Sequence, residues 1–243
     1  MVENKSLSIE NINVLNSEKI IQDFFENQQP QLDVINSEMG EILNKIYGVP
    51  GDIVELGVHT GNNATQFMWH CPERRYFGFD TFSGYTEEDL SIDPNKKELK
   101  ENEGRWNYDE NETIERLQDL RKKLCQFARL MLNDKNITFL YEFDIIKGDL
   151  KQTLPKNIEK GNISQIALLY VDCNAYAAAL KGMECAYPLM PKGAMICIDE
   201  HKNGGETKAL EEMSKKYNLP IEETGFEFVA NIHSNPSKYI VKK

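Results

Sequence analysis

Short apolar segments that end in a carboxylate or a glycine recur along the chain and alternate with segments of helical periodicity. The clearest is Ile166–Asp172, and Asp52–Gly57, Arg75–Asp80 and Ala194–Glu200 follow the same pattern. Strands that alternate with helices form a parallel sheet with right-handed crossovers. The pattern therefore predicts an α/β fold with a doubly wound, mostly parallel sheet, whose ligand lies at the carboxyl ends of the strands.

The remaining segments predict one domain with additions. Apolar residues at helical spacing, Ile20 to Phe25 among them, predict an N-terminal helical extension or lid over residues 1–50, followed by a single domain over 51–243. Residues 86–111 are charged and lack an apolar period, so we expect a surface insertion or mobile loop there. A long amphipathic helix follows from Ile114, which extends the insertion to about residue 135.

Three further strands complete a sheet of seven. The expected strands are Phe139–Ile146, Glu227–Ile232 and Lys238–Val241, the last two forming an antiparallel hairpin at the C-terminus.

Composition excludes several classes of protein. The net charge of −11 disfavours nucleic acid as a partner, because an acidic surface repels phosphate backbones. No apolar run is long enough for a membrane span and no signal peptide is visible, so a cytoplasmic protein is expected. The five cysteines contain no Cys-x-x-Cys pair and are expected to be reduced thiols.

A glycine-containing turn follows the first strand, in the segment Glu55–Gly61. Its Gly-x-x-x-Gly spacing differs from the dinucleotide fingerprint and disfavours nicotinamide cofactors, while the carboxylate of Glu55 suits an ammonium or hydroxyl group. Asp80 ends the second strand and suits the two hydroxyls of a ribose, the alternative being a helix cap. Asp149 follows Gly148 and is expected either to meet an adenine amino group or to cap the next helix.

Three carboxylates end two neighbouring strands: Asp172, Asp199 and Glu200. Such groups repel one another and raise each other's pKa unless a cation lies between them. Hard oxygen ligands suit Mg²⁺, which would act as a Lewis acid on a substrate hydroxyl. The alternative is that the three residues are separate caps and ion-pair partners.

At these residues the chain resembles the macrocin O-methyltransferase (TylF) family of S-adenosylmethionine (SAM)-dependent sugar O-methyltransferases. The resemblance runs from about Pro50 to Met213, and the matching segments are Pro50–Val58, Phe79–Gly84, Lys147–Pro155, Ile166–Tyr176 and Tyr187–Glu200. It implies a Rossmann-like class I methyltransferase fold, SAM and Mg²⁺ as cofactors, and a homodimer or larger assembly. The implied metal ligands are Asp172, Asp199 and Glu200. The implied cofactor-binding residues are Glu55, Gly57, Val58, His59, Gly61, Asp80, Thr81, Ser83, Gly148, Asp149 and Asp172.

Two positions depart from the family pattern. Asn174 stands where the family has an aspartate thought to be the general base, and Glu200 stands where an aspartate is usual. Because an asparagine cannot accept the proton, the expected catalytic residues are Asp172, Asn174 and His201, with His201 as the replacement base. An exposed loop histidine is the alternative for His201, and His59 is a second candidate base.

The resulting hypothesis is metal-assisted methylation of a sugar hydroxyl, on a nucleotide-activated sugar or a glycoside that feeds a surface polysaccharide or a glycosylated metabolite. Methylation of a small amine is one alternative, since a neutral amine needs less help from a base. A SAM-binding protein without catalysis is the other.

Overall fold

The computed structural model describes residues 37–132, 141–200, 204–226 and 236–243. Three features expected from the sequence lie outside these ranges: the helix near Ile20, the strand Glu227–Ile232 and the candidate base His201.

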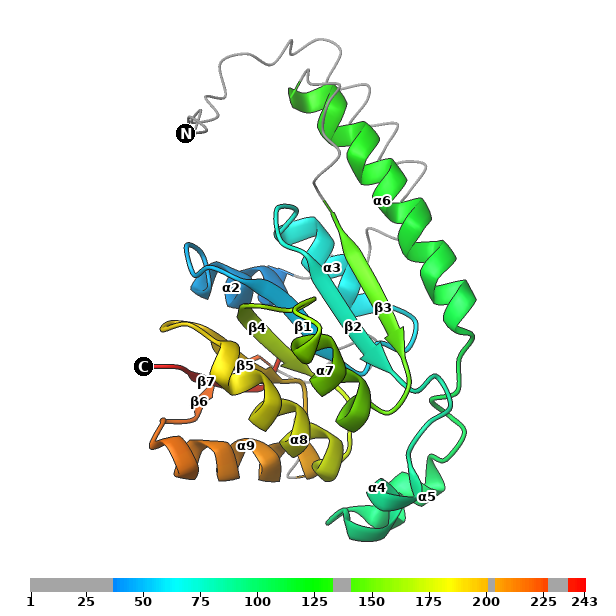
Figure 1. Ribbon diagram of the computed structural model, residues 1–243, viewed down its shortest axis with the longest axis vertical. Coiled ribbons are helices and arrows are strands. Elements are labelled where there is room, and N and C mark those ends of the chain that lie inside the picture. The colour runs from blue at the N-terminus through cyan, green and yellow to red at the C-terminus, as the bar shows by residue number, and fades with distance from the viewer. Residues whose placement is uncertain (1–36, 133–140, 201–203, 227–235) are drawn as a thin grey trace.

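A seven-stranded mixed sheet forms the centre of the molecule, in the order β3-β2-β1-β4-β5-β7-β6 (Figure 1). Five strands are parallel, and β7 runs antiparallel to both β5 and β6. The strands in sheet order are β3 (Phe143–Lys147), β2 (Tyr76–Asp80), β1 (Asp52–Leu56), β4 (Ile166–Val171), β5 (Met195–Ile198), β7 (Lys238–Val241) and β6 (Glu222–Glu223). The doubly wound fold with antiparallel C-terminal strands is confirmed.

Helices cover both faces of this sheet (Figure 1). One hydrophobic core lies between the sheet and α7 (Leu150–Glu159), α8 (Tyr176–Ala186) and α9 (Gly205–Tyr217). The short 3₁₀ helix η2 (Tyr187–Leu189) follows α8. A second core lies between the sheet and α2 (Ser37–Lys45), α3 (Asn62–His70) and α6 (Glu110–Leu132).

The strand sequences explain this two-sided burial. Neighbouring residues of a strand point to opposite faces, so Val54 and Leu56 of β1 pack in the first core while Ile53 packs in the second. Every residue of β4 is buried, as expected for a central strand covered on both faces. The apolar composition of these strands thus stabilises the central sheet, and the site lies at the carboxyl ends of its strands.

The insertion contains two short helices, α4 (Glu87–Ile92) and α5 (Lys96–Glu101), in the segment for which the sequence predicts a surface insertion or mobile loop. The residues that favour the first of these helices are polar. Thr86 and Asp89 form a reciprocal capping box at the start of α4, where three acidic residues also favour the helix dipole. Figure 1 shows α4 and α5 beyond the carboxyl ends of β2 and β3. A search for apolar periodicity could not find such helices.

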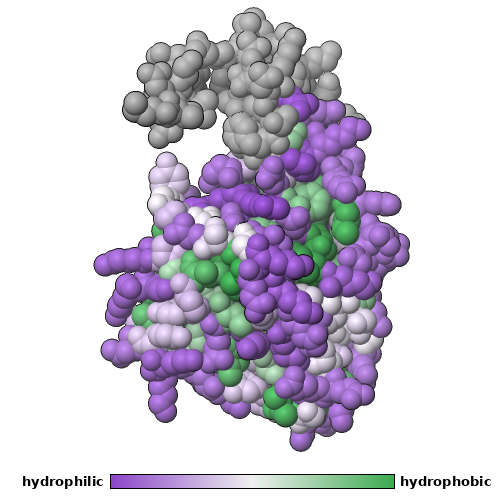
Figure 2. Space-filling model, viewed as in Figure 1, coloured by the Kyte–Doolittle hydropathy of each residue, from purple (hydrophilic) through white to green (hydrophobic). Residues whose placement is uncertain are grey.

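The face of the molecule in Figure 2 is mostly hydrophilic, with smaller hydrophobic areas between charged side chains. Among the described residues, no helix combines the length and apolar character that crossing a bilayer requires. All five cysteines lie in the described ranges and carry free thiols.

Candidate functional site

A cavity of about 510 Å³ lies at the carboxyl ends of the parallel strands β1 to β5. The loops that follow these strands form its inner wall, and the insertion between β2 and α6 forms its outer wall. Of the residues expected in the site, ten line the cavity: Gly57, Val58, His59, Asp80, Thr81, Gly148, Asp149, Asp172, Asn174 and Asp199.

Gly57 brings the turn after β1 against the turn after β4. Its φ is 93°, and a Cβ at this position would lie 2.0 Å from the carbonyl oxygen of Asp172. No side chain fits at that distance, so glycine is required for the close approach. Gly61, with φ 77°, lies behind the cavity at the start of α3, where a Cβ would meet Leu117.

Asp80 fixes the glycine turn from the neighbouring strand. Its Oδ2 accepts hydrogen bonds from the backbone N–H groups of Val58 at 2.7 Å and His59 at 2.8 Å. Its Oδ1 accepts from the N–H of Phe82 at 2.7 Å. The carboxylate is half-buried and lines the cavity, so it both shapes the turn and offers an acceptor to a ligand.

Glu55 lies beneath the cavity, fully buried, and does not line it. Its Oε2 accepts from the hydroxyl of Tyr76, and its Oε1 accepts from Nδ2 of Asn63 at 2.7 Å. Burial raises the pKa of Glu55 well above its ordinary value, and the nearby charge of Asp172 adds to this. The same Nδ2 of Asn63 donates to Oδ2 of Asp172 at 3.0 Å. Glu55 therefore supports the wall through Asn63, a lining residue that the sequence analysis missed.

Three carboxylates meet beside the cavity: Asp172 and Asp199, which line it, and Glu206, which does not. Each offers an oxygen within 4.8 Å of the other two. Burial raises the pKa of Asp199 and Glu206 well above ordinary values, with the charge of Asp172 as the next cause. Glu206 is fully buried in the first turn of α9, and its Oε2 has no hydrogen-bond partner among the described residues.

Glu200, the expected third metal ligand, points elsewhere. Its Oε2 accepts from the backbone N–H of Thr207 at 2.9 Å, which places the carboxylate at the N-terminus of α9. Unpaired N–H groups and the positive end of the helix dipole stabilise an anion there. The structure thus substitutes Glu206 for Glu200 in the acid group. The sequence could not show this, because Glu206 enters the group only through the first turn of α9.

The turn after β4 carries Asp172, Cys173 and Asn174 along the cavity. Asn174 has φ 57°, and its backbone N–H donates to Oε1 of Glu206 at 2.6 Å. The ring of His59, the second candidate base, lies 5.5 Å from that of Trp106 and 5.3 Å from that of Tyr108, measured between centroids.

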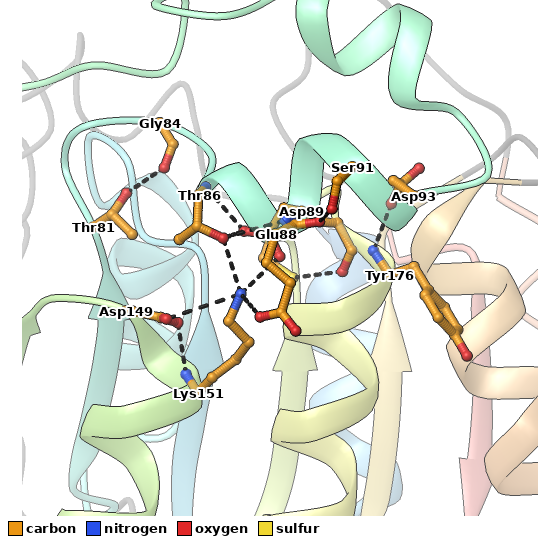
Figure 3. Close-up of polar contacts among 12 residues, drawn as sticks. Thr81, Gly84, Thr86, Glu88, Asp89, Ser91, Asp93, Asp149, Lys151 and Tyr176 are labelled. Atoms are coloured by element: carbon orange, nitrogen blue, oxygen red, sulfur yellow. Dashed lines mark hydrogen bonds and ion pairs between the residues drawn. The ribbon is translucent and has the colours of Figure 1, made fainter.

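The insertion between β2 and α6 also supplies part of the cavity wall. Its lining residues are Thr81, Gly84, Tyr85, Thr86, Asp89, Arg105 and Trp106. The hydroxyl of Thr81 donates to the carbonyl of Gly84 at 2.6 Å (Figure 3), whereas Ser83 is exposed and does not line the cavity. Asp149 caps α7 by accepting from the N–H of Lys151 at 3.0 Å, and its carboxylate still borders the cavity.

The sequence of the chain is similar to those of known methyltransferases. The family model described as macrocin-O-methyltransferase (TylF) matches residues 29–224. Mycinamicin III 3''-O-methyltransferase of Micromonospora griseorubida is 24% identical over 159 residues, which are 63% of this chain. The match spans little more than half of that relative, 56% of its length.

Two solved structures share the fold. CalS11, a calicheamicin methyltransferase, aligns with a TM-score of 0.61 and 18% identity over 99% of both chains. The O-methyltransferase NovP aligns with a TM-score of 0.59 and 20% identity over 85% of this chain and 78% of its own.

Proposed function

Because the chain belongs to the macrocin-O-methyltransferase (TylF) family, we propose that it transfers a methyl group from SAM to a hydroxyl of a sugar, either free, nucleotide-activated or glycosidic. One observation carries the proposal. A single cavity has the glycine turn and Asp80 on one wall and the carboxylates of Asp172 and Asp199 on another. The relative named mycinamicin III 3''-O-methyltransferase supports transfer to a hydroxyl oxygen.

The cofactor is assigned to the wall built by β1, β2 and α7. The closely packed turn at Gly57 and the half-buried carboxylate of Asp80 suit the ribose, which needs hydroxyl acceptors at the end of the second strand. Asp149 and Gly148 border the same wall and suit the adenine. In this assignment Glu55 does not contact the cofactor but holds the side chain of Asn63 in position.

Mg²⁺ fits the acid group. Three carboxylates within 4.8 Å of one another repel strongly, and the unpartnered Oε2 of Glu206 provides a free oxygen beside Asp172 and Asp199. We therefore assign Asp172, Asp199 and Glu206 as the residues that hold the ion, with Glu200 as the cap of α9. When bound, the ion supplies Lewis-acid polarisation of the acceptor hydroxyl.

The acceptor oxygen must lie in line with the methyl group and lose its proton during transfer. Asn174 borders the cavity and can hydrogen-bond the acceptor, but its amide cannot take the proton. His201 remains our proposed base. Tyr85 and Trp106 of the insertion line the cavity, and we propose that they help to exclude water from the reacting groups.

We assign the product to a glycosylated metabolite or a surface polysaccharide, made in the cytoplasm by a homodimer. The acceptor in this assignment is a small sugar, because the walls of the cavity offer polar groups that can hydrogen-bond its hydroxyls.

Calorimetric titration with S-adenosylhomocysteine (SAH), the product of SAM, tests the cofactor site. Asp80→Ala should weaken SAH binding by about tenfold or more, since a hydrogen bond to a charged group contributes about 1.5–3 kcal/mol. Asp144→Ala is the matched control. Asp144 is on β3, outside the cavity, and forms an exposed ion pair with Arg75. A wild-type protein that does not bind SAH would contradict the proposed function.

A further inference from the structure

Polar contacts join helix α4 of the insertion to the body of the protein at the N-terminus of α7 and at the N-terminus of α8 (Figure 3). At the first point, Nζ of Lys151 lies 2.9 Å from Oγ1 of Thr86, 3.0 Å from Oδ1 of Asp89 and 2.9 Å from Oε2 of Glu88. The same Nζ lies 3.9 Å from Oδ2 of Asp149. One cation thus joins α4 to the wall that carries Asp149.

The position of Lys151 is not explained by the stability of its own helix. It is the second residue of α7, where the positive end of the helix dipole disfavours a cation. Its side chain is only 13% exposed, so the charge also needs partners to offset its loss of hydration. Those partners come from Thr86, Glu88 and Asp89, so Lys151 serves the contact with the insertion.

At the second point, Asp93 caps a helix that lacks a cap of its own. The residue before α8 is Ala175, which has no side-chain hydrogen bond to the helix. Oδ2 of Asp93 accepts from the backbone N–H of Tyr176 at 2.7 Å, and Oδ1 accepts from the N–H of Asn95 at 2.7 Å. Asp93 is 3% exposed, which makes this a buried, charge-assisted bond between the insertion and the body.

The two points lie on two walls of the cavity, one at the start of α7 and the other at the start of α8, and these helices pack side by side. The N-terminus of α7 follows Asp149 directly, and the N-terminus of α8 follows the turn that carries Asp172 and Asn174. We propose that α4 is a clamp that sets the position of these two walls relative to each other, with Lys151 and Asp93 as its positioning residues. The assignment of Asp149 to the cofactor side comes from the proposed function, and the effect of the clamp on cofactor binding rests on that function.

The clamp predicts that losing Lys151 acts on cofactor binding more than on the chemical step. Lys151→Met should increase amide hydrogen exchange over residues 86–101 of the ligand-free protein by about tenfold or more. It should also raise KM for SAM by about tenfold while changing kcat less than about twofold. Lys151→Arg keeps the charge and should restore most of both properties, which a purely structural role in α7 does not predict.

Lys216→Met is the matched control. Lys216 also forms an ion pair, 2.7 Å from Oε1 of Glu184, but both side chains are exposed and neither lines the cavity. Its exchange pattern and KM should equal those of the wild type. Unchanged exchange over residues 86–101 in Lys151→Met would overturn the clamp.

Two further measurements keep the clamp testable independently of the function. If Lys151→Met does not fold, as judged by circular dichroism, Asp93→Ala replaces it and should increase exchange over residues 175–180 instead; unchanged exchange there overturns the clamp. Because exchange is measured without ligand, absence of SAH binding in the wild type would reject the proposed function and not the clamp. Normal SAH binding by the wild type, together with unaltered hydrogen exchange in Lys151→Met, would reject the clamp and not the proposed function.

Discussion

The backbone N–H of Asn174 donates a 2.6 Å hydrogen bond to Oε1 of Glu206 and so connects the turn after β4 to the first turn of α9. The first of these segments holds Asn174, one of the two positions that depart from the family pattern. Where the family pattern has an aspartate, residue 174 is an amide, and a carboxylate from α9 lies directly beside it. Glu206 keeps its second oxygen for the acid group formed with Asp172 and Asp199.

The first prediction separates Glu206 from Glu200. Glu206→Gln should weaken Mn²⁺ binding, measured by electron paramagnetic resonance as a probe for Mg²⁺, by about 10- to 100-fold. Loss of residues that merely support ligands already costs about that much. Glu200→Gln is the control and should leave the affinity for Mn²⁺ close to that of the wild type while lowering Tm slightly, because Glu200 caps α9. The reverse order of affinities would return Glu200 to the metal site.

A second prediction concerns the pH dependence of stability. Burial and the charge of Asp172 raise the pKa of Asp199 and Glu206, so the folded protein retains protons that the unfolded chain releases. Without metal, the contribution of these groups to stability is complete below about pH 4, the ordinary carboxyl range, and is lost as the pH rises toward the folded-state pKa values. Mg²⁺ should therefore raise Tm more at pH 8 than at pH 5, because binding displaces these protons.

Thermal melts with Mg²⁺ or EDTA across this pH range measure the effect. Glu206→Gln removes one of the two titrating groups and should flatten the metal-free curve. A Mg²⁺ effect that is independent of pH would show that these carboxyls do not hold the ion.

A third prediction tests the close approach at Gly57. Gly57→Ala should abolish SAH binding and lower Tm, because its Cβ would overlap the carbonyl oxygen of Asp172. Gly161→Ala is matched in backbone conformation, with φ 74°, but its Cβ meets nothing within 4 Å. It should cost only about 1 kcal/mol of strain and leave SAH binding intact. Equal effects of the two substitutions would mean that backbone conformation alone requires the glycine at position 57.

A fourth prediction concerns the proposed base. His201→Ala should lower kcat by about 10²-fold or more, the usual contribution of a general base, and should remove the fall of kcat below neutral pH. KM for SAM should change little, since His201 is not assigned to the cofactor. His233→Ala serves as the control for loss of a histidine. Retention of full activity and of the same pH profile in His201→Ala would exclude the histidine.

Much of the fold followed from the sequence because it depends on local apolar patterns. Segments such as Ile166–Val171 are recognisable as buried strands, and a parallel sheet brings their carboxyl ends together, which placed Asp80, Asp172 and Asp199 around one cavity.

The parts that the sequence did not reveal depend on side chains from elements far apart in the chain. The position of Glu55 at the end of the first strand predicts a carboxylate that faces the ligand, whereas Tyr76 and Asn63 hold it beneath the cavity. The sequence pattern indicates Glu200 as the third ligand, but its carboxylate binds the N-terminus of α9, and Glu206 joins Asp172 and Asp199 instead. The contacts of Lys151 span 62 to 65 residues and leave no local signal.

The central claim is most directly tested by conversion of SAM to SAH with a panel of free and nucleotide-activated sugars, in Mg²⁺ and in EDTA. The account predicts turnover with at least one sugar, loss of turnover in EDTA and its recovery when Mg²⁺ is restored. Turnover of an amine in preference to every sugar, at the same rate in EDTA, would contradict it.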